Sequence, residues 1–357
     1  MAVTEYGVNH PLAVKAWERK LAREALKRCY VGKFMGKGTG NVIQVKNDLS
    51  KGPGDRVTVG LRMQLSGAGI QGDSTLEGNE EALTTYSDNL FIDQLRHAVR
   101  RAGKMSEQRV PFDVRDEAMS GLADWWADRI DTWFFNQVCG NTGVSDQRYT
   151  GLQATVAPST TTAGGSGNTR FLLGDGVGTS AESSISASQF FQLSYIDRAV
   201  VQAQTATPLI RPITGAGDVE YVMFLHPWQV YNLRTDVSSS RITWFQTQLG
   251  RVQGGERDSN PIFSGALGIY NNVLLHQSVR IPAVVSNTRR AVLCGAQAAI
   301  MAFGQGSSDK PNWFEELFDY GNQLGVAGGM IAGLKKSVFN SIDFGTIVVS
   351  TYATAPA

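Results

Sequence analysis

Apolar and polar positions alternate along residues 55–65 in the pattern of a β-strand. The apolar residues, at every second position, are Val57, Val59, Leu61, Met63 and Leu65. A period of two gives a strand with one apolar and one solvated face. After a segment rich in glycines and acids comes a second extended run, SDNLFIDQLRHAVRRAG. The two runs predict a long two-stranded hairpin, which needs a surface to lie on because such ribbons are marginally stable.

Helical periodicity marks four further segments. Residues 12–30 repeat apolar side chains at three- and four-residue spacing and carry basic ones on another face. The longest pattern follows Asp113, a favourable N-cap, and stops at Gly140. Its apolar stripe consists of Val114, Ala118, Leu122, Trp126, Ile130, Trp133 and Val138. Shorter helices are predicted at about 188–204 and near 242–252.

Further strands are predicted in the second half of the chain. EYVMFLHPWQVYNLR reads as a buried strand stopped at Pro227, and later strands fall at VLLHQS, AVLCGA and FGTIVVSTYA. Residues 141–187 are poor in hydrophobic side chains and rich in Gly, Ser and Thr, which predicts a surface excursion. Helices and strands mix without regular alternation, so the predicted fold class is α+β.

Composition narrows the class of protein. The 357 residues include 33 basic and 32 acidic ones, so overall charge does not favour a protein that coats nucleic acid. The odd number of cysteines, far apart in sequence, predicts buried thiols of an intracellular product. The first twenty residues lack a signal-peptide pattern, and no apolar run is long enough for a membrane span. We therefore expect synthesis and initial use in the cytoplasm.

Candidate catalytic chemistry is weak. GKFMGKGT at 32–39 resembles a phosphate-binding loop, but it has three residues where four are needed and lacks the hydroxyl after its Gly-Lys pair. The paired carboxylates at 80–81 and 315–316 are adjacent in sequence and diverge on a strand or helix. No histidine has a second ligand at metal spacing; they are His10, His97, His226 and His276. The sequence therefore predicts no enzyme, cofactor or metal.

Charge is segregated around the predicted hairpin. Between Met63 and Leu95 there is no Lys or Arg, and the acids are Asp73, Glu77, Glu80, Glu81, Asp88 and Asp93. The basic residues that soon follow are Arg96, Arg100, Arg101, Lys104, Arg109 and Arg115. This segregation is either a solvated surface without a role or an acidic limb that docks on a basic surface of another copy. Such a head-to-tail contact closes rings of subunits.

Several blocks of the sequence, in order, resemble the major capsid proteins of tailed phages typified by coliphage N-four. They include GDRVTVGLRMQLSGAGIQGDSTLEGNEEAL, DQLRHAVRRAGKMSEQRVPFDVRDEAMSGLADWWADRID, FLHPWQVYNLR, NPIFSGALGIYNNVLLHQS, LCGAQAA and WFEELFDYGNQLGV. The likeness runs from about Val42 to Phe344. It implies the Hong Kong 97 capsid fold, an α+β fold with an N-terminal arm, an extended E-loop, and peripheral and axial domains.

The resemblance implies boundaries for these parts. They are an N-terminal arm at 1–47, an E-loop hairpin at 48–101, a peripheral domain at 102–187 with a spine helix at 114–140 and a surface excursion at 141–187, an axial domain at 188–286, and a return segment at 287–357 with the terminal strand. The arm begins close to Met1, so a separate scaffold protein is expected. Because residues 63–95 lack lysine, lysine crosslinks between E-loops and neighbours are not expected.

The implied function is a non-enzymatic shell protein that assembles in the host cytoplasm into pentamers and hexamers of an icosahedral virion head. Implied partners are other copies, a scaffold, a portal, decoration proteins and non-specifically bound double-stranded DNA. The expected E-loop contacts are Asp73, Glu77, Glu80, Glu81, Val57, Val59 and Leu61. The expected basic contacts are Arg96, Arg100, Arg101 and Arg109. The DNA candidates are Lys15, Arg19, Arg23 and Lys27. Two alternatives stay open: an encapsulin-like shell, which encloses enzymes, and a P-loop enzyme.

Overall fold

The computed structural model describes most of the chain, in nine stretches. They are 31–47, 54–110, 113–159, 170–174, 181–214, 219–236, 244, 267–305 and 312–356. The predicted helix at 12–30 and its four DNA candidates lie outside these residues. So does the predicted helix near 242–252, apart from Trp244.

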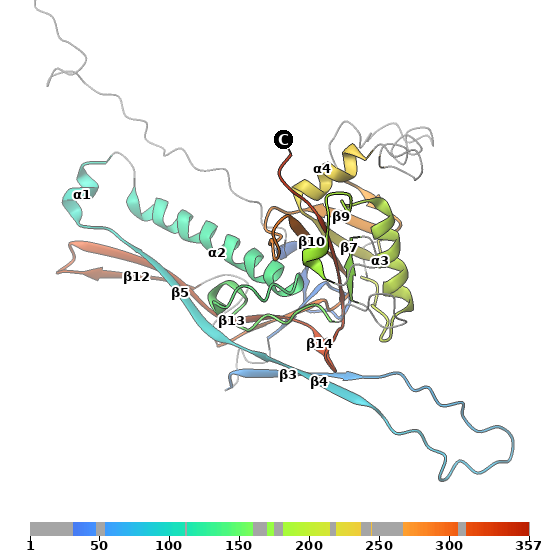
Figure 1. Cartoon of the computed structure of the whole chain (residues 1–357). Coiled ribbons are helices and arrows are strands. Elements are labelled where there is room, and N and C mark those ends of the chain that lie inside the picture. The colour runs from blue at the N-terminus through green and yellow to red at the C-terminus, as the bar shows by residue number, and fades with distance from the viewer. Residues whose placement is uncertain are drawn as a thin grey trace, which may run out of the picture.

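A six-stranded mixed sheet forms the centre of the body (Figure 1). β10 lies between β16 and β7 and is antiparallel to both, whereas β6 and β9 add parallel strands on either side. Helices α3 (Leu193–Thr205) and α4 (Pro227–Thr235) pack their apolar residues against it. The strands in sheet order are β6 (Phe171–Leu173), β16 (Thr346–Tyr352), β10 (Thr288–Cys294), β7 (Tyr221–Leu225), β9 (Val273–Gln277) and β8 (Ile269–Tyr270).

A second six-stranded sheet leaves the body as an elongated extension (Figure 1). Its centre is the fourteen-residue strand β13 (Gln323–Lys336), which pairs with β11 near its end and with β12 near its start. Strand β5 pairs along the other side of β13. The remaining strands are β1 (Met35–Gly36), β2 (Ile43–Lys46), β5 (Asp93–Arg100), β11 (Ala299–Phe303) and β12 (Asn312–Phe318).

The smaller elements complete the chain. Strands β3 (Arg56–Arg62) and β4 (Thr85–Phe91) form the base of a hairpin that projects from the body on the side opposite the extension (Figure 1). The others are η1 (Val31–Phe34), α1 (Lys104–Gln108), α2 (Val114–Val138), η3 (Gln147–Tyr149), η4 (Glu182–Ser184), β14 (Val338–Phe339) and β15 (Ile342–Asp343).

Helix α2 confirms the longest helical prediction. The side chain of Asp113 accepts a hydrogen bond from the backbone N–H of Arg115 at 2.8 Å, which satisfies a helix-start donor. Gly140 follows the helix with φ of 63°, a conformation that favours glycine. The apolar stripe packs on the extended sheet and then enters the core, where Trp126 and Trp133 are fully buried. The helix therefore spans both parts of the molecule.

Two predictions about extended segments are wrong. The run at 87–103 is not one strand paired with its hairpin partner: it divides at Ile92, and the part after it pairs with β13. The described part of residues 141–187 is not a surface excursion throughout, because it contributes the buried strand β6 and the fully buried Arg170. β6 is drawn inward because it pairs in parallel with β16 and extends the central sheet.

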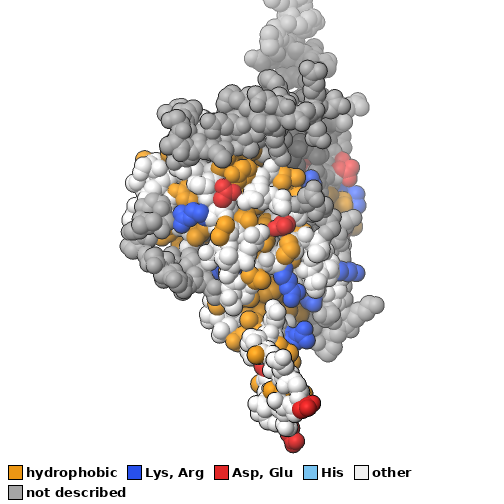
Figure 2. All heavy atoms as spheres, turned by 90° about the vertical axis from the view of Figure 1, so that its right-hand side faces the viewer, with side chains coloured by type: hydrophobic (Ala, Val, Ile, Leu, Met, Phe, Trp, Pro, Cys, Tyr) orange, Lys and Arg blue, Asp and Glu red, His pale blue; other side chains and the backbone are white. Residues whose placement is uncertain are grey.

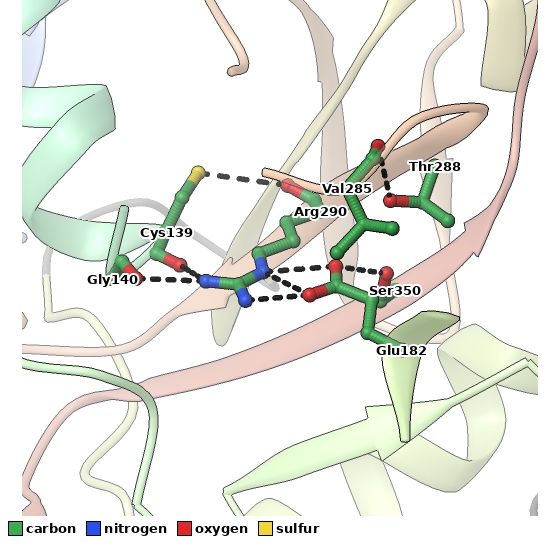
Figure 3. Close-up of polar contacts among 7 residues, drawn as sticks. All are labelled: Cys139, Gly140, Glu182, Val285, Thr288, Arg290 and Ser350. Carbon is green, nitrogen blue, oxygen red and sulfur yellow. Dashed lines mark hydrogen bonds and ion pairs between the residues drawn. The ribbon is translucent and has the colours of Figure 1, made fainter. Parts of the chain in front are cut away.

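A buried ion pair joins the end of α2 to the central sheet (Figure 3). The guanidinium of Arg290 on β10 contacts the carboxylate of Glu182 at 2.6 Å and donates to the carbonyl oxygens of Cys139 and Gly140 at 2.9 and 2.7 Å. The hydroxyl of Ser350 on β16 donates to the same carboxylate at 2.6 Å. Burial also raises the pKa of the Cys139 thiol to about 12. One arginine thus satisfies helix-end carbonyls and a buried acid together.

Candidate assembly interfaces

The hairpin continues beyond its paired strands as a limb, defined here as residues 63–84. The N–H of Met63 still donates to the carbonyl of Thr84 at 3.0 Å, after which the two chains run on without regular pairing. Figures 1 and 2 show the limb clear of the body. Its exposed apolar side chains are Leu65 (57%), Ile70 (39%), Leu76 (61%) and Leu83 (56%). A limb with this much uncovered apolar surface is suited to a partner.

Two of the predicted limb acids act inside the limb. The carboxylate of Glu81 accepts the backbone N–H groups of Ser66 and Gly67 at 2.8 and 2.7 Å, so it bridges the two chains of the limb. These backbone hydrogen bonds hold the pKa of Glu81 below its usual range. The carboxylate of Glu80 accepts the N–H of Gly78 at 2.8 Å. Both acids therefore shape the limb, a role that the sequence analysis did not assign to them.

The acids nearest the tip are directed outward. Asp73 and Glu77 are exposed, and the structure gives them no hydrogen bond or ion pair with any other described residue. Figure 2 shows acidic side chains gathered at the free end of the limb and basic ones nearer the body. Of the four predicted contact acids, these two have the geometry of a docking charge.

The apolar residues predicted to contact the next subunit, Val57, Val59 and Leu61, do not all face outward. Val57 is 7% exposed and packs with Leu90 against Ile300 on β11, and Val59 packs beside them. Val57 is therefore covered by its own chain, contrary to the prediction that it faces the next subunit. Leu61 is half-buried and lies one rung before the last pair of the hairpin strands. The outward apolar surface begins beyond it.

The predicted basic residues also differ in what they contact. Arg100 stacks on the ring of Phe318 and donates to Gln323, and Arg101 pairs with Glu107. These contacts stay within the extended sheet and the turn around α1. Arg96 and Arg109 are exposed and form no ion pair with another described residue. They are the two of the four that remain available to another copy.

Strand β12 is a further exposed surface, which the sequence analysis did not identify. Along the sheet, Phe314 is 63% exposed on one face and Leu317 is 62% exposed on the other, which is the face covered further along by α2. Tyr320, in the turn that follows, is fully exposed. In the described part of the chain β12 pairs only with β13, so one of its edges is open. The strong apolar content of WFEELF was a signal that could have identified it.

The described stretches contain neither a metal cluster nor a membrane-spanning helix. In the described stretches, no group of three or more His, Cys, Asp and Glu residues is placed to hold a metal ion. No helix within those stretches combines the length and the apolar character needed to cross a bilayer. The side chain of His226 accepts from the N–H of Trp228 at 3.2 Å and caps α4, so this histidine has a structural role.

Comparison with known proteins shows which family the chain resembles. The family model described as phage capsid protein matches residues 5–355. The major capsid protein of Pseudomonas phage KPP25 is 29% identical, over 95% of this chain and 94% of that protein.

Solved capsids have the same fold. The structure of the Ralstonia phage GP4 capsid superposes with a TM-score of 0.79 at 32% identity, with all of both chains covered. The cyanophage Pam1 capsid gives a TM-score of 0.78 at 20% identity, over 99% of this chain and 100% of that one, which is a likeness of fold. The chain belongs to the phage capsid protein family, and it is the major capsid protein of a tailed phage.

Proposed function

We propose that this chain builds an icosahedral head from pentamers and hexamers, with the Hong Kong 97 arrangement of N-terminal arm, E-loop, spine helix, and peripheral and axial domains. In this assignment the limb is the outer part of the E-loop and α2 is the spine helix. The observation that carries the proposal is the limb itself, because its leucines and its two tip acids find no cover within the described part of their own chain. A surface of this kind is stabilised when a neighbouring copy covers it.

The contact is proposed to pair the tip acids with the available arginines of the next copy. Asp73 and Glu77 would lie near Arg96 and Arg109, with the limb leucines supplying apolar contact between them. Opposite potentials fix partner and register, whereas the apolar surface supplies most of the affinity. Gly69, Gly72 and Gly78 all have positive φ. Glycine adopts this conformation without strain, so the limb can follow the differing neighbours of a closed shell.

Charge reversal with rescue tests this contact. The double variant Asp73→Lys/Glu77→Lys and the double variant Arg96→Glu/Arg109→Glu should each lower the yield of shells, by about tenfold if the charges fix the register. Combining all four changes should restore shells. The control is Asp93→Lys, an exposed acid of similar charge outside the limb. Negative-stain microscopy and sedimentation count the shells; separate reversals with unchanged yield would contradict the contact.

The other proposed partners are packaged DNA and the proteins that help the shell to assemble. A net charge of +1 indicates weak, sequence-independent contact with packaged double-stranded DNA, confined to basic residues on the inner wall. A scaffold, a portal and decoration proteins are proposed as helpers, with assembly in the host cytoplasm and no enzymatic activity. The encapsulin-like alternative is not favoured by the capsid relatives. Particles purified from infected cells should absorb as nucleoprotein at 260 nm; protein cargo without DNA would contradict a genome-containing head.

A further inference from the structure

The hairpin meets the body through one face of β4 and β3. Leu90 and Val57 are cross-strand neighbours on that face, and they form the apolar contact with Ile300 on β11. The next rung of the same face carries Asp88 opposite Val59. After three further rungs, one of them on this face, the paired strands end and the limb begins. Asp88 is therefore a polar side chain of the hairpin that contacts the body close to the point where the limb begins.

Both oxygens of the Asp88 carboxylate are occupied. Oδ1 forms an ion pair with Nζ of Lys335 on β13, and Oδ2 accepts the backbone N–H of Val338 on β14 at 3.1 Å. Nζ of Lys335 also donates to the carbonyl oxygen of Asn89 at 3.0 Å. The side chain of Asp88 is 11% exposed and that of Lys335 is 19% exposed. This is a directional, charge-assisted contact in a largely desolvated place.

We propose that Asp88 and Lys335 form a clamp that sets the direction in which the limb leaves the body, and that they are positioning residues for docking on the next copy. The significance for assembly rests on the docking role of the limb proposed above. From the last rung to the tip the limb spans about eleven residues, or roughly 36 Å of extended chain. A rotation of about 10° at the clamp would displace the tip by about 6 Å, more than the reach of a hydrogen bond.

The contact around the clamp explains why one side chain can control this angle. The hairpin has two strands, and its apolar contact with the body is small: two buried side chains on the hairpin meet two on β11. Two-stranded hairpins are marginally stable by themselves. A non-directional apolar contact of this size resists separation but tolerates rotation. The clamp adds two bonds of fixed geometry on a different strand, β13, and on β14, so it removes that freedom.

Asp88→Asn is the sharpest variant because it preserves shape. Both carboxylate oxygens accept from donors, so in either orientation the Asn amide places its own N–H₂ group against Lys335 or Val338. Lys335→Met removes the cation while keeping an unbranched stem, and it is an independent test on the opposite strand. The matched control is Asp93→Asn, which changes an exposed acid whose carboxylate, among the described residues, accepts only the adjacent N–H of Gln94.

The first measurement is made on the unassembled full-length chain. Spin labels are attached to cysteines introduced by Ser74→Cys on the limb and Ser194→Cys on α3, and they report the limb-to-body distance. Cys29→Ser removes one competing thiol, and Cys139 and Cys294 are buried and do not compete for the label. Asp88→Asn and Lys335→Met should broaden this distance distribution and lower the exchange protection of the Val338 amide by about tenfold. Asp93→Asn should change neither. Circular dichroism melting should show the body folded in all three variants.

The second measurement is the yield of closed shells from the same preparations. We expect a loss of at least about tenfold for Asp88→Asn and Lys335→Met, with no loss for Asp93→Asn. An unchanged distance distribution in both clamp variants overturns the clamp, whatever the shell yield. A broadened distribution with normal shells leaves the clamp in place and overturns the docking role of the limb.

Discussion

Arg290 in the body and Glu81 in the limb each hold two stretches of chain together through a charged side chain, but in different surroundings. Arg290 is buried with Glu182 and satisfies the end of α2, so removing it leaves a buried acid without its ion pair and the carbonyl of Cys139 without its donor. Glu81 bridges the limb in open solvent, where water replaces any lost hydrogen bond. The body is thus stabilised by its own interior, whereas the limb is shaped by weak local contacts.

This difference fits the division of work in a shell subunit. The body has to keep one structure in every position of the shell, and close packing around Trp126 and Trp133 provides that. In the docking role proposed for it, the limb adapts to neighbouring copies, and its solvent-exposed local hydrogen bonds are of the kind that open at low cost. The clamp at Asp88 lies between the two regions. We expect substitutions in the body to change stability and substitutions in the limb to change assembly.

The largest expected effect is at the end of α2. Arg290→Ala should lower the free energy of unfolding by about 3–5 kcal/mol, because Glu182 would stay buried without its partner. The neighbouring Arg289→Ala removes a side chain that stacks on Trp228 and should cost only about 1 kcal/mol. Urea unfolding of the unassembled chain measures both. Equal losses in the two variants would show that the buried pair does not hold the body together.

An intermediate effect compares the same change in the body and in β3, the hairpin strand that leads into the limb. A Cβ at Gly333 on β13 would lie 2.0 Å from the carbonyl oxygen of Phe91, so Gly333→Ala forces backbone to move and should cost about 2 kcal/mol. A Cβ at Gly60 on β3 has no atom within 4 Å, and Gly60→Ala should change stability by less than about 0.5 kcal/mol. Thermal melting distinguishes them; a tolerated Gly333→Ala would contradict tight packing at the hairpin base.

The smallest effect is the acid response of the limb. The folded pKa of Glu81 lies below its ordinary value of 4.5, so its contribution is complete above that value and is lost as pH falls through the lowered pKa. Hydrogen exchange of residues 63–84, corrected for intrinsic rates, should show protection at pH 6 and its loss as the pH falls below the ordinary carboxyl value of 4.5. Glu81→Gln should exchange faster at pH 6 and show no step. A step that persists in this variant would assign the response to another group.

Local signals made much of the body predictable. Helix α2 begins after Asp113 and ends before Gly140, as predicted, and its apolar stripe faces the core. These features were predictable because helical spacing depends on the segment alone. β7 and β16 were likewise identified as apolar runs. The partner of β5 was not predictable, because β13 lies more than two hundred residues later and an extended run does not specify its partner.

Asp88 shows how far the candidate site could be predicted. Its negative charge grouped it with the acids of the limb. Its position two residues from Leu90 on the same strand, however, places both side chains on one face, and Leu90 is buried. The alternation that identified the strand thus contained the signal that Asp88 faces inward. Its partner, Lys335, is close only in the folded chain. The roles of Glu80 and Glu81 depended on the turn of the limb, which composition does not define.

Strand β12 has a consequence for handling the protein before it enters a shell. It exposes large apolar side chains on both faces and leaves one edge open, which is the surface on which unrelated strands associate. If another copy covers β12 in the shell, ordered assembly and disordered aggregation compete for this strand in a free subunit. Because aggregation rises steeply with concentration, the soluble yield should depend on how quickly each new subunit meets a growing shell. Slow synthesis beside preformed shells should give more soluble protein than rapid synthesis alone.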